Sequence, residues 1–195
     1  EKRPGELRNE IVWIGSEHTP ISEARYVPPP PDLVRDLMED LERFANEDLK
    51  LPPLIQCALL HYQFETIHPY LDGNGRIGRL LITLFLYRKG MLPKPLLYLS
   101  VYFERTRINY YDQLFNLSAT GDWEAWLNYF FDGVYEQAQD AIRRIRRIRE
   151  VLDKYKALLL EHNETANALR LVDGLMASPV TSISNAVRTL GVSQP

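Results

Sequence analysis

This chain has little of several features that usually narrow down the class of a protein. Its 195 residues include one cysteine, Cys57, so no internal disulfide can form. A single cysteine fits a reducing compartment, and we expect a cytoplasmic protein. No apolar run approaches the roughly 20 residues that a membrane-spanning helix needs, so we expect no membrane association. The formal net charge of -3 argues against a protein that coats nucleic acid non-specifically.

The chain also lacks an initiator methionine and a recognisable signal peptide, and we expect that further residues precede Glu1. What is present is an ordinary globular composition, with 45% apolar and 25% charged residues. The length suits one sizeable core with an appendage.

Apolar residues recur at helical spacing over most of the chain, which predicts a mostly α fold. The expected helices cover residues 33–47 with Asp32 as the cap, 53 to just before Pro69, 77–89, 100–117, 122 to about 161, a short stretch from about 166, and 182–190. The first 31 residues differ. Residues 11–15 and 21–27 predict two short strands around a turn, and Pro28 to Pro31 then force extended backbone.

The segment from His68 to Arg79, HPYLDGNGRIGR, lies between two apolar helices and concentrates groups that suit phosphate chemistry. Gly73 and Gly75 can adopt positive φ, so successive N–H groups can form an anion site together with the N-terminus of the next helix. Arg76 and Arg79 are three residues apart and share a face of the first helical turn, where both can bind phosphate oxygens.

Two further residues of this segment suit catalysis. Asp72 is a hard oxygen ligand for a Mg²⁺ ion that bridges phosphates. His68 has a pKa range suited to removing a proton near neutral pH. The spacing Gly73-x-Gly75-x-x-Gly78 also fits the dinucleotide fingerprint, but that fingerprint must follow a strand of a βαβ unit. Since the preceding segment is helical, we discount a dinucleotide site.

These twelve residues resemble the signature of the Fic family, HPFx(D/E)GNGRxxR, with Tyr70 in place of phenylalanine as the single departure. The resemblance runs from about Pro4 to about Gln137 and includes Gly5-Glu6-Leu7-Arg8, Trp13-Ile14-Gly15 and Gly121-Asp122-Trp123.

The resemblance implies a Fic-fold helical core over residues 1–137, with a short β-hairpin flap at about 11–27 and the signature loop at 68–79. A long connecting helix over 138–165 and a small helical extension over 166–195 would follow. The extension is similar to the start of the helix-turn-helix or winged-helix appendage of some bacterial members.

Family membership would imply transfer of AMP from ATP to a Tyr, Thr or Ser hydroxyl of a protein, with release of pyrophosphate. His68 would be the base, and Asp72 would hold Mg²⁺. The implied nucleotide-binding residues are Gly73, Asn74, Gly75, Arg76, Ile77, Gly78, Arg79, Tyr110 and Tyr111. The flap would pair with an extended segment of the target protein through Ile11, Val12, Trp13, Ile14 and Gly15.

Several alternatives remain open at this point. The protein could modify itself, form a homodimer, remove AMP, or transfer a different phosphate-containing group. It could also be an ATP-sensing regulator that contacts DNA through the C-terminal module of a longer protein. Many relatives carry an inhibitory helix with the pattern (S/T)xxxE(G/N). Thr19 to Glu23 matches its first part, but Ala24 follows and Pro20 lies inside, so we find no such helix in this sequence.

Other conspicuous residues are expected to be structural. His61 is expected to pack in the core, and Glu65 to accept a hydrogen bond at a helix end. The three tryptophans are expected to be core anchors: Trp13, Trp123 and Trp126. From Ile142 to Arg149, isoleucines recur every third residue between pairs of arginines, which favours a packed apolar face with a solvated basic back over a nucleic-acid stripe.

Overall fold

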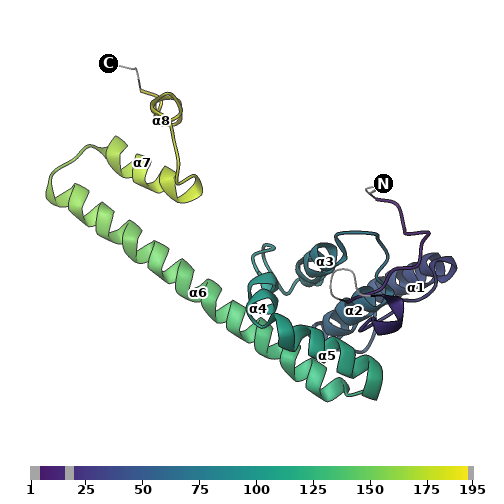
Figure 1. Cartoon of the computed structure of the whole chain (residues 1–195). Coiled ribbons are helices and arrows are strands. Elements are labelled where there is room, and N and C mark those ends of the chain that lie inside the picture. Colours follow the sequence, from purple (N-terminus) through teal and green to yellow (C-terminus); the bar gives the residue numbers. More distant parts are fainter. Residues whose placement is uncertain (1–4, 16–19, 193–195) are drawn as a thin grey trace. The chain divides into compact units, whose positions relative to one another are not determined.

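The computed structural model describes residues 5–15 and 20–192, and most of these residues are helical (Figure 1). The expected mostly α fold is therefore confirmed. The chain forms two units, Glu1–Ala138 and Gln139–Pro195, and one long helix, α6 (Trp123–Glu161), contributes to both. The other elements of the first unit are the 3-10 turns η1 (Ile21–Glu23) and η2 (Pro31–Leu33) and the helices α1 (Val34–Asn46), α2 (Pro53–Ile67), α3 (Asn74–Arg88), α4 (Leu99–Arg105) and α5 (Arg107–Thr120).

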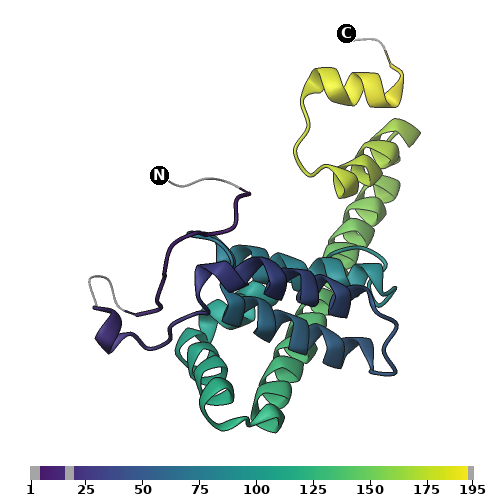
Figure 2. The same ribbon diagram turned by 90° about the vertical axis from the view of Figure 1, so that its right-hand side faces the viewer.

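Helix α2 is central to the first unit, since it packs against both α1 and α3 (Figure 2). Its apolar residues occur on all sides of the helix, and nine of its fifteen residues are buried. Pro53 begins the helix, and Ile67 ends it two residues before Pro69, as the steric effect of proline on preceding residues predicts. The loop that carries the polar residues therefore starts where the most buried helix stops.

One tryptophan anchors this core. Trp126 of α6 is fully buried, and its indole Nε1 donates a hydrogen bond to the carbonyl oxygen of Ala58 at 3.1 Å. Trp13 and Trp123 are 44% and 43% exposed, so the expectation that they are also core anchors is wrong. The ring of Trp123 makes an edge contact with the ring of Tyr62, at 5.3 Å between centroids.

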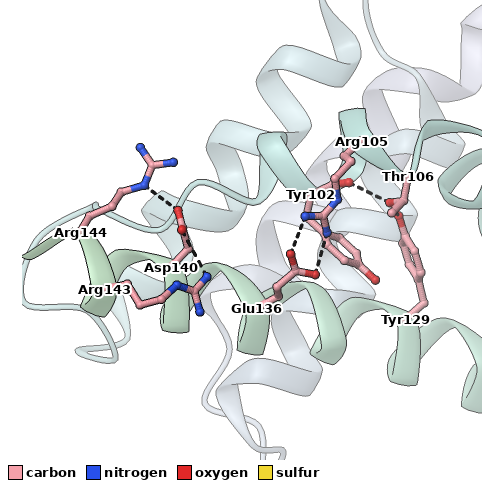
Figure 3. Close-up of polar contacts among 8 residues, drawn as sticks. All are labelled: Tyr102, Arg105, Thr106, Tyr129, Glu136, Asp140, Arg143 and Arg144. Atoms are coloured by element: carbon pink, nitrogen blue, oxygen red, sulfur yellow. Dashed lines mark hydrogen bonds and ion pairs between the residues drawn. The ribbon is translucent and has the colours of Figure 1, made fainter. Parts of the chain in front are cut away.

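Polar contacts join the α4–α5 corner to α6 (Figure 3). The guanidinium of Arg105 contacts both carboxylate oxygens of Glu136, at 2.6 and 2.7 Å. The hydroxyl groups of Thr106 and Tyr129 lie 2.7 Å apart. The sequence predicts one helix over 100–117, but the backbone leaves helical angles at Thr106 (φ -106°, ψ 31°), which separates α4 from α5.

Two helix starts differ from the expectation. Asp32 does not cap α1, because it lies inside the 3-10 turn that precedes the helix. Helix α3 begins at Asn74 rather than 77, since Gly73 already supplies the turn into the helix. Asp122 does cap α6, and its Oδ1 accepts a hydrogen bond from the amide of Ala125 at 3.0 Å.

The expected β-hairpin at 11–27 is not confirmed. Among residues 11–15 and 20–27, the structure has a single antiparallel bridge between Ile14 and Tyr26, with Ile14 N to Tyr26 O at 2.8 Å. The second expected strand starts instead with the 3-10 turn Ile21–Glu23, which follows Pro20. Residues 16–19, which include the predicted turn and part of the weak inhibitory pattern, lie outside the described residues.

The second unit contains the C-terminal part of α6 and two short helices, α7 (Ala166–Ala177) and α8 (Ile183–Leu190). Both short helices were expected, and each has a side-chain cap. The hydroxyl oxygens of Thr165 and Ser182 accept hydrogen bonds from amides three residues later. Along α6, Asp140 pairs with Arg143 and Arg144 one turn further on (Figure 3).

The apolar face expected at Ile142 to Arg149 is not covered. Ile142, Ile145 and Ile148 are 43%, 59% and 50% exposed, so the prediction of a packed face is wrong for the described residues. In the part of the chain that the structure describes, no helix is both long and apolar enough to cross a membrane.

Candidate functional site

A cavity of about 920 Å³ opens in the first unit between the end of α2, the start of α3, α5 and the residues around the Ile14–Tyr26 bridge. It brings together predicted site residues from distant parts of the sequence. Those that line it are His68, Asp72, Gly75, Arg79, Tyr110 and Tyr111, with Trp13, Ile14 and Gly15 of the proposed flap.

His68 is the residue at which α2 ends. Its backbone is left-handed (φ 51°, ψ 61°), while its amide still donates to the carbonyl of Phe64 at 3.0 Å. A positive φ is uncommon for a residue with a side chain, and it persists where the surroundings fix the backbone.

Arg8 supplies that constraint from the N-terminal segment. Its side chain is buried, and its guanidinium donates to the carbonyls of Ile67 (3.2 Å), His68 (2.8 Å) and Pro29 (2.6 Å). Its amide also donates to the carbonyl of Pro69 at 2.9 Å. The last carbonyl groups of a helix lack intrahelical hydrogen-bond donors, and the Arg8 guanidinium supplies such donors at the end of α2. Sequence reasoning quoted Arg8 within a motif but assigned it no role.

The imidazole of His68 is held in its neutral form. Burial lowers its pKa below the ordinary value of 6.5; the nearby carbonyl of Glu65 partly offsets this, and the Arg8 cation lowers the pKa further. Nδ1 is enclosed and has no hydrogen-bond partner among the described residues, so Nε2 is the nitrogen available to a proton from the cavity. A neutral imidazole near pH 7 can act as a general base.

The start of α3 presents backbone amides to the loop. Gly73 has φ 88°, and the first i to i-4 bond of the helix runs from Ile77 N to Gly73 O at 3.0 Å. The amides before it, of Asn74, Gly75 and Arg76, belong to the first turn, where N–H groups lack intrahelical acceptors. Such a helix N-terminus favours anions.

The side chain of Asn74 fixes the loop rather than lining the cavity. It is buried, its Oδ1 accepts from the amide of Tyr70 at 2.8 Å, and its Nδ2 donates to the carbonyl of Tyr70 at 2.7 Å. Both ends of the amide are therefore occupied within the protein, which leaves only the backbone of Asn74 for a ligand.

The two arginines bend back over the glycines at the start of α3. A Cβ added to Gly75 would lie 2.9 Å from Nη1 of Arg79, and one added to Gly73 would lie 3.5 Å from Nη2 of Arg76. Both guanidinium groups thus lie near the first-turn amides. The glycines leave the space that these side chains occupy.

Gly78 does not line the cavity and lies against α2. A Cβ at this position would lie 2.3 Å from Oε1 of Glu65 and 3.0 Å from the ring of Phe64, and the carbonyl of Gly78 lies 3.1 Å from Nδ1 of His61. Gly78 therefore allows α2 and α3 to pack closely. Ile77, Arg76 and the flap residues Ile11 and Val12 are likewise absent from the cavity lining.

Asp72 lies on the cavity wall, and its Oδ1 is 3.6 Å from Nη2 of Arg76. The described residues contain no cluster of three or more His, Cys, Asp or Glu side chains that could hold a metal by themselves. A lone carboxylate beside a phosphate site still fits Mg²⁺, which is often bound by one or two carboxylates together with substrate phosphates and waters.

A buried pair supports the wall on α5. His61 was expected to pack in the core, and it is fully buried, with Nε2 2.9 Å from the hydroxyl of Tyr110. Since the Gly78 carbonyl can only accept, His61 Nδ1 is the donor there and Tyr110 donates to Nε2. Burial lowers the pKa of His61 to about 3, so this arrangement is uncharged at any ordinary pH.

Glu65 is the residue of the site that sequence reasoning missed. It was expected to be a hydrogen-bond partner at a helix end, but its Oε1 is buried with no hydrogen-bond partner in the described part of the chain, and the residue lines the cavity. Burial raises its pKa to about 7, against the lowering effect of Arg79. Glu65 lies in the last turn of α2, and the sequence around it gives no signal that its side chain is buried.

The segment around the bridge is attached to two helices. The Tyr26 hydroxyl donates to the carbonyl of Thr66 in α2 at 3.1 Å. Arg25 forms an ion pair with Asp112 of α5. The carbonyl and amide of Ile14 are occupied by Arg25 and Tyr26, so a further chain would have to pair with Trp13 or Gly15.

Comparison with known proteins agrees with this geometry. The sequence profile described as the Fic/DOC family matches residues 2–86. Protein adenylyltransferase fic-1 of Caenorhabditis elegans is 31% identical over 127 residues, which cover 64% of this chain and 22% of that protein. Protein adenylyltransferase Fic of Drosophila melanogaster is 37% identical over 91 residues, which cover 46% of this chain and 17% of that protein.

The crystal structure of a Fic family protein from Desulfovibrio desulfuricans G20 superposes with a TM-score of 0.62 at 25% identity, over 97% of this chain and 51% of that chain. The chain thus spans only about a fifth of the curated relatives (22% and 17%) and half (51%) of the solved one. The fold, the signature loop and these similarities agree, and the chain carries a Fic/DOC family domain.

Proposed function

We propose that this protein transfers AMP from ATP to a hydroxyl side chain of a protein. One observation carries the proposal: Gly75 at the N-terminus of α3 and Arg79, whose guanidinium lies beside it, line the same cavity as His68, whose pKa is lowered by burial. An anion site and a proton acceptor in one cavity suit a transfer from a polyphosphate. The names of the two animal relatives, protein adenylyltransferases, support the same activity.

We assign the removal of the hydroxyl proton to His68. Nε2 accepts the proton of a Tyr, Thr or Ser hydroxyl as its oxygen forms a bond to the α-phosphorus of ATP. The bond from that phosphorus to the β-phosphate oxygen breaks, and pyrophosphate leaves. Catalysis comes from positioning and from charge stabilisation, as in other phosphoryl-type transfers.

We assign the stabilisation of the phosphate charge to the start of α3. The amides of Gly75 and Arg76 and the guanidinium groups of Arg76 and Arg79 offer hydrogen bonds to the phosphate oxygens. Asp72 would hold Mg²⁺, which neutralises phosphate charge when bound. Gly73 and Asn74 act through the loop backbone, while Tyr110 and Tyr111 supply aromatic wall for the adenosine.

The target protein would approach along the flap. Trp13 and Gly15 flank the Ile14–Tyr26 bridge at the cavity, and an extended segment that pairs there would bring its hydroxyl toward His68. Residues 1–137 would be the catalytic domain, 138–165 a connecting helix and 166–195 a partial helix-turn-helix. A DNA contact through that last part, a homodimer, self-modification and a cytoplasmic location stay in the proposal as secondary features.

The test is transfer of label from ATP in the presence of Mg²⁺. With ATP labelled at the α-phosphorus, the protein itself or an added protein acceptor should become labelled, and mass spectrometry should find one AMP on a hydroxyl side chain. ATP labelled at the γ-phosphorus should leave no label. Transfer of the γ-label, or an added mass other than AMP, would contradict the proposal.

A further inference from the structure

Glu65 is a buried acid on the wall of the proposed nucleotide cavity, and no step of the proposed mechanism uses it. The residue is 9% exposed, and its Oε1 has no hydrogen-bond partner among the described residues. Burying a carboxyl oxygen without a partner is unfavourable, and more so if the group is ionised. Such a group near a binding site is a candidate for a functional role.

The packing of α2 on α3 makes room for this carboxyl group. Oε1 lies 2.3 Å from the position that a Cβ of Gly78 would occupy, so glycine is required for Glu65 to reach the space between the helices. Arg79 follows Gly78 in α3, and it lowers the pKa of Glu65 electrostatically. Glu65 and the arginine that we propose binds phosphate line the same cavity.

Among the charged and titratable groups around the cavity, Arg79 is the cation whose charge lowers the pKa of Glu65. The Tyr110 hydroxyl of α5 donates a hydrogen bond to Nε2 of His61, and burial disfavours the charged form of both groups. The remaining charged or titratable residues of the lining are Glu23, Arg25, Tyr26, His68, Asp72, Arg107 and Tyr111.

We propose that Glu65 is a positioning residue for Arg79, and that it takes up a proton when the phosphates of the nucleotide bind. The inference rests on the proposed function. In the empty cavity the carboxylate attracts the Arg79 guanidinium. Bound phosphates compete for that guanidinium and bring negative charge close to a buried acid. Both effects favour the protonated form of Glu65.

The proton uptake by Glu65 determines how the affinity for ATP changes with pH. Below the pKa of Glu65, the acid is already protonated and nucleotide binding needs no proton. Above it, each binding event must also protonate Glu65, so the affinity for ATP falls as the pH rises. The fall is about tenfold for each unit by which the nucleotide raises this pKa.

The experiment is calorimetric titration of the whole chain with ATP and Mg²⁺ at pH 6, 7.5 and 9, for the wild type, Glu65→Gln and His68→Ala. The wild type should lose affinity by about tenfold or more from pH 6 to pH 9. Glu65→Gln should lose most of that dependence, because the amide cannot titrate. His68→Ala should keep it. Ionisation of the nucleotide itself contributes equally to all three proteins.

Two outcomes would overturn the inference while leaving the proposed function in place. One is equal pH dependence in the wild type and Glu65→Gln. The other is loss of the dependence in His68→Ala, which would make the imidazole the proton acceptor. A wild type that binds no ATP at any pH would overturn the proposed function and this inference together.

A second measurement covers the case in which Glu65→Gln does not fold. Proton uptake on binding is obtained at pH 8 from titrations in buffers of different ionisation enthalpy, for the wild type and His68→Ala. Uptake that persists in His68→Ala supports Glu65 as the acceptor. Absence of uptake, or its loss in His68→Ala, contradicts the inference.

Discussion

At the scale of single residues, the half-buried His68 and the buried Glu65 line the cavity, and their pKa values move in opposite directions. Burial lowers the pKa of His68 and raises that of Glu65. The cause is the same, since a buried site disfavours the charged form of either group. The imidazole is left ready to accept a proton, and the carboxyl group is left close to neutrality.

We expect His68→Ala to abolish labelling from ATP while ATP binding persists. The imidazole is the only group we assign to the proton step, and a general base contributes about 100- to 10,000-fold to a rate. The phosphate site that we propose lies on α3, which the substitution does not touch. Labelling of the variant is compared with the wild type at saturating ATP, and binding is checked by calorimetry. Normal labelling would remove His68 from its role.

Glu65→Gln should change the dependence of stability on pH. The pKa of Glu65 rises from its ordinary 4.5 to about 7 on folding, so between these values the native state binds more protons than the unfolded state. Wild-type stability then falls as the pH rises through this window, by up to ~3 kcal/mol from this group. Glu65→Gln has no titrating group at this position, so its stability relative to the wild type should increase from pH 4 to pH 8.

Urea unfolding of both proteins at pH 4 and pH 8 measures this difference. Every other titrating group is shared, so the change in the difference between the two proteins isolates Glu65. A difference that is the same at both pH values would show that the acid is not buried as described.

Four of the residues that line the cavity could be predicted from a dense local motif. His68, Asp72, Gly75 and Arg79 lie within twelve residues. Glu65 could not be predicted as a site residue, and Arg8 was assigned no role there, because their positions depend on tertiary packing. The burial of Glu65 requires the absence of a side chain at Gly78, thirteen positions later in the sequence.

At the scale of elements, two glycines of α3 should separate binding from folding. Gly78→Ala places a Cβ 2.3 Å from Oε1 of Glu65 and 3.0 Å from Phe64, so we expect a loss of about 1–3 kcal/mol of stability from overpacking. Gly75→Ala meets only the mobile end of Arg79, at 2.9 Å. It should displace that guanidinium and weaken ATP binding, by about tenfold if one charged hydrogen bond is lost.

The two variants serve as controls for each other. Thermal unfolding should show a lowered midpoint for Gly78→Ala and an unchanged or slightly raised midpoint for Gly75→Ala, since alanine favours helix over glycine. A destabilised Gly75→Ala with normal ATP affinity would contradict the arrangement of Arg79 over the start of α3.

The apolar periodicity predicted the helices, whereas the turns and the breaks between helices were harder to predict from the sequence. Asn74 starts α3 because Gly73 can adopt positive φ, and that choice is made by the loop rather than by the apolar pattern. Thr106 interrupts a pattern that continues through it, since its hydroxyl contacts Tyr129 from a distant helix. The flap failed as a pair of strands because Pro20 leads into a 3-10 turn.

At the scale of the whole molecule, the core is confined to the first unit. The buried apolar residues run from Val34 to Phe130, with Ala138 the last residue packed against them. We therefore expect a chain that ends at Ala138 to unfold in one cooperative transition and to keep its affinity for ATP. Circular dichroism on heating and calorimetric titration test this. A shortened chain without a transition would show that residues after 138 are needed for the fold.

The contacts of Arg8 have a consequence for the integrity of the chain. The guanidinium of Arg8 donates hydrogen bonds to carbonyl groups at the end of α2 and lowers the pKa of the His68 imidazole. A protease that cut the backbone once between Arg8 and α1 would convert this intramolecular contact into a bimolecular one, with loss of its effective concentration. Such a nick should abolish the proposed labelling from ATP while the helices stay folded, as labelling and circular dichroism of the cleaved protein would show.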